Sequence, residues 1–163
     1  MTFDDLLARH GAALWRAVAS YSPPGAERDD LAQEVLVAVW QALPRFRGEG
    51  SPRGFVLRIA HNRGLSLAWS RARRPAAQSE VVELPDPRPG ADDQLVAGQR
   101  TERLLRHLRA LPLGQRQVLT LALEGLPHAE IAAIAGITTE NVAVRLGRAR
   151  EALRRSLEKE EAA

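Results

Sequence analysis

A proline-rich, acidic stretch in the middle of the chain constrains the fold more than any other feature. Residues 75–94, PAAQSEVVELPDPRPGADDQ, hold four of the chain's ten prolines and show no sustained periodicity. Proline lacks the backbone donor that helices and inner strands need, so such a stretch is typical of a linker. The chain has 163 residues, enough for two small domains, which we place at 1–74 and 95–163.

An ordered loop is the alternative for 75–94, since Val81, Val82 and Leu84 offer an apolar contact to one of the domains. Charge divides the chain at the same place. Residues 1–74 carry 11 arginines against seven acidic residues, the stretch carries one against five, and 95–163 carry 11 basic residues against eight. Two basic blocks around an acidic spacer are not the pattern of an evenly solvated enzyme surface. Arginine also suits forked contacts with phosphates and bases.

Helical periodicity runs through both blocks. Before the linker, apolar residues recur at helical spacing up to Tyr21, then from about Asp29 to Leu43, then from the Ser51-Pro52 start to about Arg74. After it, we expect helices at 95–110, 115–124, 127–135 and 139–158. Period-two alternation is absent, so no strand is predicted. The predicted fold class is all-α, with two small helical domains joined by a Pro-rich acidic linker.

The segment 128-HAEIAAIAGITTENVAVRLGRARE-151 predicts a helix-turn-helix in the second domain. Gly136 permits a turn that residues with a Cβ adopt only at a cost, and Ile137 fills the corner. Thr138 or Thr139 can cap the helix that follows. A helix held across its partner by a short glycine-containing turn is the arrangement that places a helix in the DNA major groove.

The outward face of that second helix carries residue types that contact DNA bases. Asn141, Arg145 and Arg148 are spaced four and three residues apart, so they lie on one side. Arginine can bond guanine with two donors, and asparagine can bond adenine in the same way. The alternative is a purely structural hairpin, because glycine corners and solvated arginine stripes are both common.

Several classes of function find no support. The chain has no cysteine, and no pair among its four histidines has metal-ligand spacing, so we expect no metal site. The acidic residues are scattered over helix starts, so we expect no catalytic site, cofactor or small-molecule substrate. No apolar run reaches the roughly 20 residues of a membrane span. The N-terminus, MTFDDLLARH, lacks the basic start of a signal peptide. We therefore expect a cytoplasmic protein without membrane insertion.

Two long segments resemble one protein family. Residues 27-ERDDLAQEVLVAVWQALPRFRGEGSPRGFVLRIAHNRG-64 resemble region 2 of bacterial RNA polymerase sigma factors of the extracytoplasmic-function (ECF) group. Residues 111-LPLGQRQVLTLALEGLPHAEIAAIAGITTENVAVRLGRARE-151 are similar to region 4 of that group. With 3-FDDLLARHGAALWRAVASY-21, similar to the start of region 2, the resemblance covers nearly the whole chain. The order and spacing of the motifs make it specific.

The resemblance implies a function and its residues. Proteins of this group bind core RNA polymerase, direct it to promoter DNA and help to open the duplex, and an anti-sigma factor usually restrains them. The polymerase-binding residues would be Asp30, Gln33 and Glu34. The −10 element would be contacted by Arg47, Gly48, Glu49, Gly50, Ser51, Asn62, Arg63, Arg71, Arg73 and Arg74. The −35 element would be contacted by Thr139, Asn141, Arg145 and Arg148.

Four apolar positions test the division between core and surface. Leu31 and Trp40, with Val35, are assigned to packing. Trp69, on the basic side, either stacks on a base or covers the domain edge. It lies in 65-LSLAWS-70, where the sequence departs from the family, since many relatives have an Asp at the position of Ser66.

Two other functions compete with the sigma factor. A stand-alone helix-turn-helix regulator would bind DNA tightly without polymerase, usually as a dimer across two half-sites, yet no extra dimerisation helix is visible. A nuclease would need clustered carboxylates or a base, and the acidic residues here are dispersed.

Overall fold

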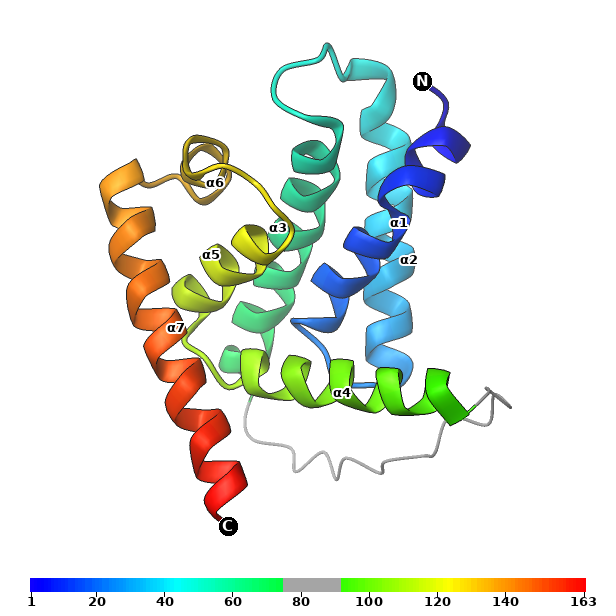
Figure 1. Ribbon diagram of the computed structural model, residues 1–163. Helices are drawn as coiled ribbons and strands as arrows, with labels where there is room; N and C mark the ends of the chain where they lie inside the picture. The colour runs from blue at the N-terminus through cyan, green and yellow to red at the C-terminus, as the bar shows by residue number, and fades with distance from the viewer. Residues whose placement is uncertain (75–91) are drawn as a thin grey trace.

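A computed structural model describes residues 1–74 and 92–163 (Figure 1), and for residues 92–97 it describes the backbone alone. Within these ranges all regular structure is helical, as the sequence predicts. The predicted linker falls almost entirely outside the described residues. Its last three residues, 92–94, already belong to a helix. None of the described helices is long and apolar enough to cross a membrane.

The first three helices pack on one another around an aliphatic core. They are α1 (Phe3–Ala19), α2 (Ala26–Ala42) and α3 (Pro52–Arg73), with a 3-10 turn, Leu43–Arg45, after α2. Thr2 and Asp5 form a capping box at the start of α1, as the sequence indicates. Ser51 caps α3 by accepting a hydrogen bond from the Gly54 amide. The fully buried core residues include Leu6, Val18, Val35, Val39 and Leu57.

Four helices form the second unit: α4 (Asp92–Arg109), α5 (Leu113–Leu123), α6 (His128–Ala135) and α7 (Thr139–Ala162). In Figure 1, α7 runs along the outer side of α5, and α4 lies across one end of α1–α3. The core of this unit contains Leu108, Val118, Leu121, Ile131 and Leu146. The seven predicted helices are thus all present in the described residues, with ends that shift by a few positions.

One such shift is at the start of α2, which begins at Ala26 rather than near Asp29. Gly25 precedes it with a φ of 146°, a backbone conformation that favours glycine, and the chain can therefore enter the helix early. The acidic residues Asp29 and Asp30, used as the first-turn signal, predict a later start than the structure has.

Four arginines satisfy the backbone of the buried turn after α1. Arg109 Nη1 donates to the Ala19 carbonyl at 2.9 Å, Arg71 Nη1 to the Tyr21 carbonyl at 2.8 Å, and Arg28 Nε to the Ser22 carbonyl at 2.8 Å. A longer bond, 3.5 Å, runs from Arg116 Nη1 to the Ser20 carbonyl. Buried carbonyl groups without partners would each cost free energy, so these arginines have a structural role.

A buried polar contact joins the two units beneath that turn. The Tyr21 hydroxyl lies 2.5 Å from His61 Nδ1, and Thr120 Oγ1 lies 3.4 Å from His61 Nε2. The Arg116 guanidinium stands over the Tyr21 ring, 5.7 Å from its centroid. At Gly64, an added Cβ would overlap the Tyr21 ring, so only glycine lets this ring lie against α3.

Candidate nucleic-acid interface

The loop before α3 exposes its backbone. Gly48 and Gly50 have φ angles of 81° and 74°, in the left-handed region that side chains disfavour. Arg47 and Glu49 alternate with them, and all four residues are exposed. The loop ends at Ser51, whose Oγ accepts from the Gly54 amide at 2.9 Å. The N-terminus of a 22-residue helix, with its partial positive charge, therefore lies at the end of the loop.

Asn62 and Arg63 are exposed on α3. Arg63 Nη1 donates to Glu34 Oε1 at 3.1 Å, and both side chains are about half exposed. Such surface pairs contribute only about 0–1 kcal/mol, so Arg63 can exchange this partner for another anion at little cost. The pair also brings a predicted −10 residue and a predicted polymerase-binding residue together.

The three arginines predicted at the end of α3 lie in different environments. Arg73 and Arg74 are exposed. Arg71 instead forms an ion pair with Glu27 and bonds the turn after α1. Burial, and the neighbouring Arg74 and Arg109 guanidinium groups, lower the pKa of Arg71. Arg71 therefore differs from the two exposed arginines, because its partners belong to the protein itself.

The exposed face of α2 contains the three predicted polymerase-binding residues, Asp30, Gln33 and Glu34. Leu31 and Val35 are buried, as predicted. The assignment of Trp40 to packing is wrong, because its side chain is 62% exposed. Val37, 53% exposed, was missed altogether. The spacing of 33, 37 and 40 continues one helix face, and this i, i+4, i+7 relation was the available signal.

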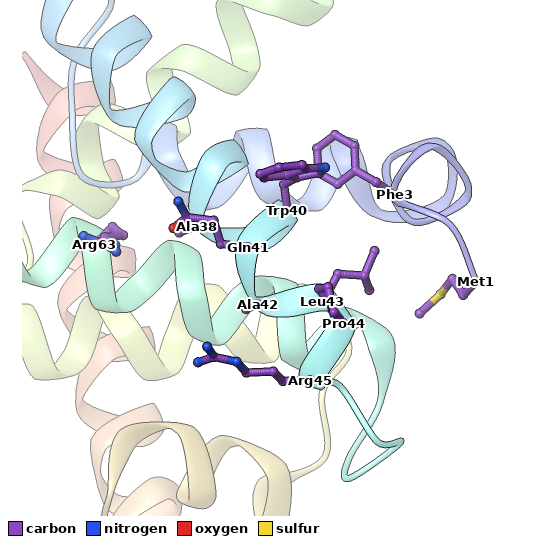
Figure 2. Close-up of a pocket in the computed structure, with 10 residues that line it drawn as sticks. All are labelled: Met1, Phe3, Ala38, Trp40, Gln41, Ala42, Leu43, Pro44, Arg45 and Arg63. Atoms are coloured by element: carbon purple, nitrogen blue, oxygen red, sulfur yellow. The ribbon is translucent and has the colours of Figure 1, made fainter.

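An open groove of about 880 Å³ lies next to Trp40 (Figure 2). Its apolar lining includes Met1, which precedes α1, Phe3 at the start of α1, and Leu43 and Pro44 in the 3-10 turn. Arg45 and Arg63 also line it. Exposed apolar surface bordered by charged groups is typical of a contact with another macromolecule.

The corner between α6 and α7 has the geometry that the sequence predicts. Gly136 ends α6 with a φ of 69°, and its N–H donates to the Ala132 carbonyl. Thr138, rather than Thr139, caps α7, because its Oγ1 accepts from the Asn141 amide at 3.1 Å. Val142 and Leu146 are buried at a spacing of four residues, which fixes the rotation of α7.

The outward face of α7 therefore presents Thr139, Asn141 and Arg148, which are exposed. Arg145 is only partly exposed, because its guanidinium lies against Gly114 of α5. A Cβ at Gly114 would come within 2.9 Å of Arg145 Nη1. Of the four predicted −35 residues, three thus lie free on the surface and one is packed beside the neighbouring helix.

His61 is fully buried immediately before the exposed Asn62. Loss of solvation lowers the pKa of His61 from 6.5 to about 3, so the ring is neutral at physiological pH. Thr120 Oγ1 lies within donating distance of the Arg116 and Gln117 carbonyls, which leaves it free to accept from His61 Nε2–H. Nδ1 then accepts from the Tyr21 hydroxyl.

Comparison with known proteins gives consistent matches to both halves. The family model described as Sigma-70 region 2 matches residues 6–74, and Sigma-70, region 4 matches residues 101–153. The RNA polymerase sigma factor CnrH of Cupriavidus metallidurans is 34% identical over 160 residues, with 93% of this chain and 84% of CnrH covered. The ECF RNA polymerase sigma-E factor of Escherichia coli K12 is 28% identical over 161 residues, with the same coverage.

Solved structures match over the same extent. The structure of CnrH in complex with the cytosolic domain of CnrY has a TM-score of 0.69 at 32% identity, over 96% of this chain and 88% of that chain. A sigma factor RpoE in complex with the anti-sigma factor NepR, from Bartonella quintana, has a TM-score of 0.73 at 22% identity and 96% coverage of both chains, which supports the fold alone. This chain belongs to the ECF group of RNA polymerase sigma factors, non-catalytic subunits that bind core polymerase and direct transcription initiation.

Proposed function

We propose that this sigma factor contacts the −10 element of its promoter through the loop 47–51 and the exposed side of α3. The observation that carries the proposal is the loop itself. Gly48 and Gly50 are exposed, with positive φ, beside the N-terminus of α3, and such a position suits an anion or a base turned out of the stack. Asn62 and Arg63 lie further along the same helix, with Arg73 and Arg74 at its end.

The −35 element is contacted by α7 in the major groove. Support comes from the exposure of Asn141 and Arg148 and from the Thr138 cap, which leaves Thr139 at the N-terminal end of the helix. Arg145 reaches a base by leaving its place beside Gly114. Phosphate contacts by the other arginines of α7 add affinity that falls with salt.

Core polymerase binds the exposed face of α2. Asp30, Gln33 and Glu34 give this face its polar part, and Val37 and Trp40 give it an apolar part. Aromatic residues supply much of the binding energy at protein interfaces, so Trp40 is the main anchor of this contact. The clamp coiled coil of polymerase is the partner.

The two domains, 1–74 and 95–163, are tethered by the Pro-rich acidic stretch between them, whose last residues, 92–94, already lie in α4. The site of action is the cytoplasm, where core polymerase and chromosomal DNA meet. An anti-sigma factor restrains the protein by covering the α2 face. The Bartonella sigma factor RpoE, which shares the fold, was solved with the anti-sigma factor NepR. Apolar exposed residues such as Val37 and Trp40 suit a competing protein surface as well as polymerase.

Run-off transcription tests the proposal. The purified protein is mixed with core bacterial RNA polymerase and a pool of genomic promoter fragments, and the transcripts are sequenced. Shared upstream elements at a fixed distance from the start sites are expected. Silence from active core enzyme, together with tight binding of the free protein to a defined DNA site, would instead indicate a stand-alone regulator.

A further inference from the structure

The end of the −10 loop is occupied by a carboxylate from the other unit. Glu130, on α6, lies 79 positions from Ser51 in the sequence. Its Oε1 accepts from the Ser51 amide at 3.0 Å and from Ser51 Oγ at 2.6 Å. Ser51 is also the cap of α3, so the carboxylate lies at the positive end of that helix.

Gly54 shows that α3 is shaped to this contact. It is buried in the first turn of α3, and an added Cβ would overlap the Glu130 carboxylate. Glycine inside a helix costs roughly 1 kcal/mol relative to alanine. The sequence thus places glycine, which disfavours a helix, at the position of α3 where a larger side chain would overlap Glu130.

A second carboxylate holds the units together nearby. Glu124, at the end of α5, is only 9% exposed at its side chain. Its two oxygens accept from Arg16 Nε and Nη2 at 2.6 and 2.8 Å. Arg53, which follows the loop in the first turn of α3, donates to the Glu124 carbonyl at 2.9 Å. The bidentate contact between Arg16 and the Glu124 carboxylate is a strong form of ion pair. The Arg53 guanidinium is bound to the same residue, Glu124.

We propose that Glu124 and Glu130 form a carboxylate clasp that closes the free protein by occupying the place of the promoter's phosphates at the −10 loop. The proposal rests on the assignment of this loop to −10 DNA. Ser51 and Arg53 cannot offer the same donors to Glu130 and Glu124 and to a DNA strand, so the clasp and the strand compete. The binding-competent fraction of the protein is then reduced by the closed population, and the apparent affinity falls by the same factor.

The contact is suited to release. The clasp is formed by hydrogen bonds and ion pairs, and its arginine partners Arg16 and Arg53 are 47% and 37% exposed, so that salt screens these pairs in part. Glu102 adds a third pair at the opposite end of the contact between the units, where Arg28 Nη2 donates to its Oε1 at 3.1 Å. Because both partners belong to one chain, closure needs no partner protein and acts at a high effective concentration.

Distance measurement between two spin labels tests the closure. The chain has no cysteine, so Gln41→Cys in α2 and Glu161→Cys in α7 give one label on each unit. Pulsed electron resonance compares this background with Glu130→Gln, with Gly54→Ala, and with a charge-matched control, Glu158→Gln. Glu158 is exposed, and among the described residues its side chain bonds only Arg154 of its own helix.

A single narrow distance is expected for the background and for Glu158→Gln. Glu130→Gln removes the charge and Gly54→Ala removes the space, so both are expected to shift population to longer and broader distances. Unchanged distributions in both variants overturn the clasp. An equal shift in Glu158→Gln also overturns it, because a general charge effect would then explain the opening.

Competition is tested with a fluorescein-labelled 12-nucleotide single strand spanning the −10 element of a promoter found by run-off transcription. Glu130→Gln is expected to bind this strand roughly tenfold more tightly than the background protein, the effect of losing one charged hydrogen-bond acceptor. Longer distances with unchanged affinity overturn the competition. If no variant binds the strand although the distances shift, the −10 assignment of the loop fails and the closure itself stands.

Discussion

His61 makes the stability of the protein depend on pH in a defined window. The ring is fully buried between Tyr21 and Thr120, and burial lowers its pKa to about 3 from an ordinary value of 6.5. In the unfolded chain the same ring takes up a proton below pH 6.5. The unfolded state therefore binds more protons between pH 6.5 and about 3, and stability falls as pH falls through this range.

The magnitude follows from the shift. One pH unit between the two pKa values corresponds to about 1.4 kcal/mol, so His61 alone is expected to remove about 2 kcal/mol on going from pH 6.5 to 5.0. A typical domain has a free energy of unfolding of about 5–15 kcal/mol, so the loss expected from His61 is a large part of it.

Urea unfolding followed by circular dichroism at pH 7.5 and 5.0 measures the effect. His61→Gln keeps hydrogen-bonding capacity without titrating, so its loss of stability between the two pH values is expected to be smaller than that of the wild type by about 2 kcal/mol. His128 is exposed at the start of α6, and His128→Gln serves as the control that retains the wild-type dependence. Equal pH dependence in the wild type and His61→Gln would refute a neutral, buried His61.

Three further substitutions have expected outcomes. Gly64→Ala forces the Tyr21 ring from α3 and is expected to lower the free energy of unfolding by about 1–3 kcal/mol, measured by urea denaturation. Trp40→Ala is expected to weaken binding to core polymerase by at least about 2 kcal/mol in a fluorescence titration, with unfolding unchanged because the side chain is exposed; equal affinity would exclude Trp40 from the contact. Arg145→Ala is expected to cost about 1–3 kcal/mol of binding free energy at the −35 element, and Arg150→Ala is expected to cost less. Unchanged affinity of Arg145→Ala would show that Arg145 does not contact a base.

The sequence was sufficient for features that depend on local chemistry. Helix ends marked by Ser51, Pro52 and Gly136 were predicted because caps, proline and positive φ act over one or two turns. Trp40 was wrongly assigned to the core because the number of apolar residues on α2 does not reveal which face is covered. Its spacing from Gln33 and Val37 placed it on the polar face of the helix, but how far that face is covered depends on where α1 and α3 pack.

The arginines show a second limit. The family resemblance assigned Arg71 to −10 DNA, yet Arg71, together with Arg28 of α2, satisfies the buried turn after α1. The chemical type of these residues is the same as that of Arg73 and Arg74. Only the three-dimensional position of the turn decides which guanidinium groups have carbonyl partners and which face solvent.

The contacts of Glu124 and Glu130 were the least predictable from the sequence, because their partners belong to the other unit, across the linker. The glycines of α3 connect them to promoter binding. Gly54 admits the Glu130 carboxylate, Gly64 admits the Tyr21 ring, and Asn62 lies between these two positions on the exposed side. Gly64 is required by Tyr21 of the first unit, whereas Gly54 has its close contact with Glu130 of the second unit. A helix that served only to contact DNA would be more stable with alanine at position 54. Glycine at this position is explained if α3 must also receive the second unit, so that closure of the chain and access of DNA to the loop depend on one surface.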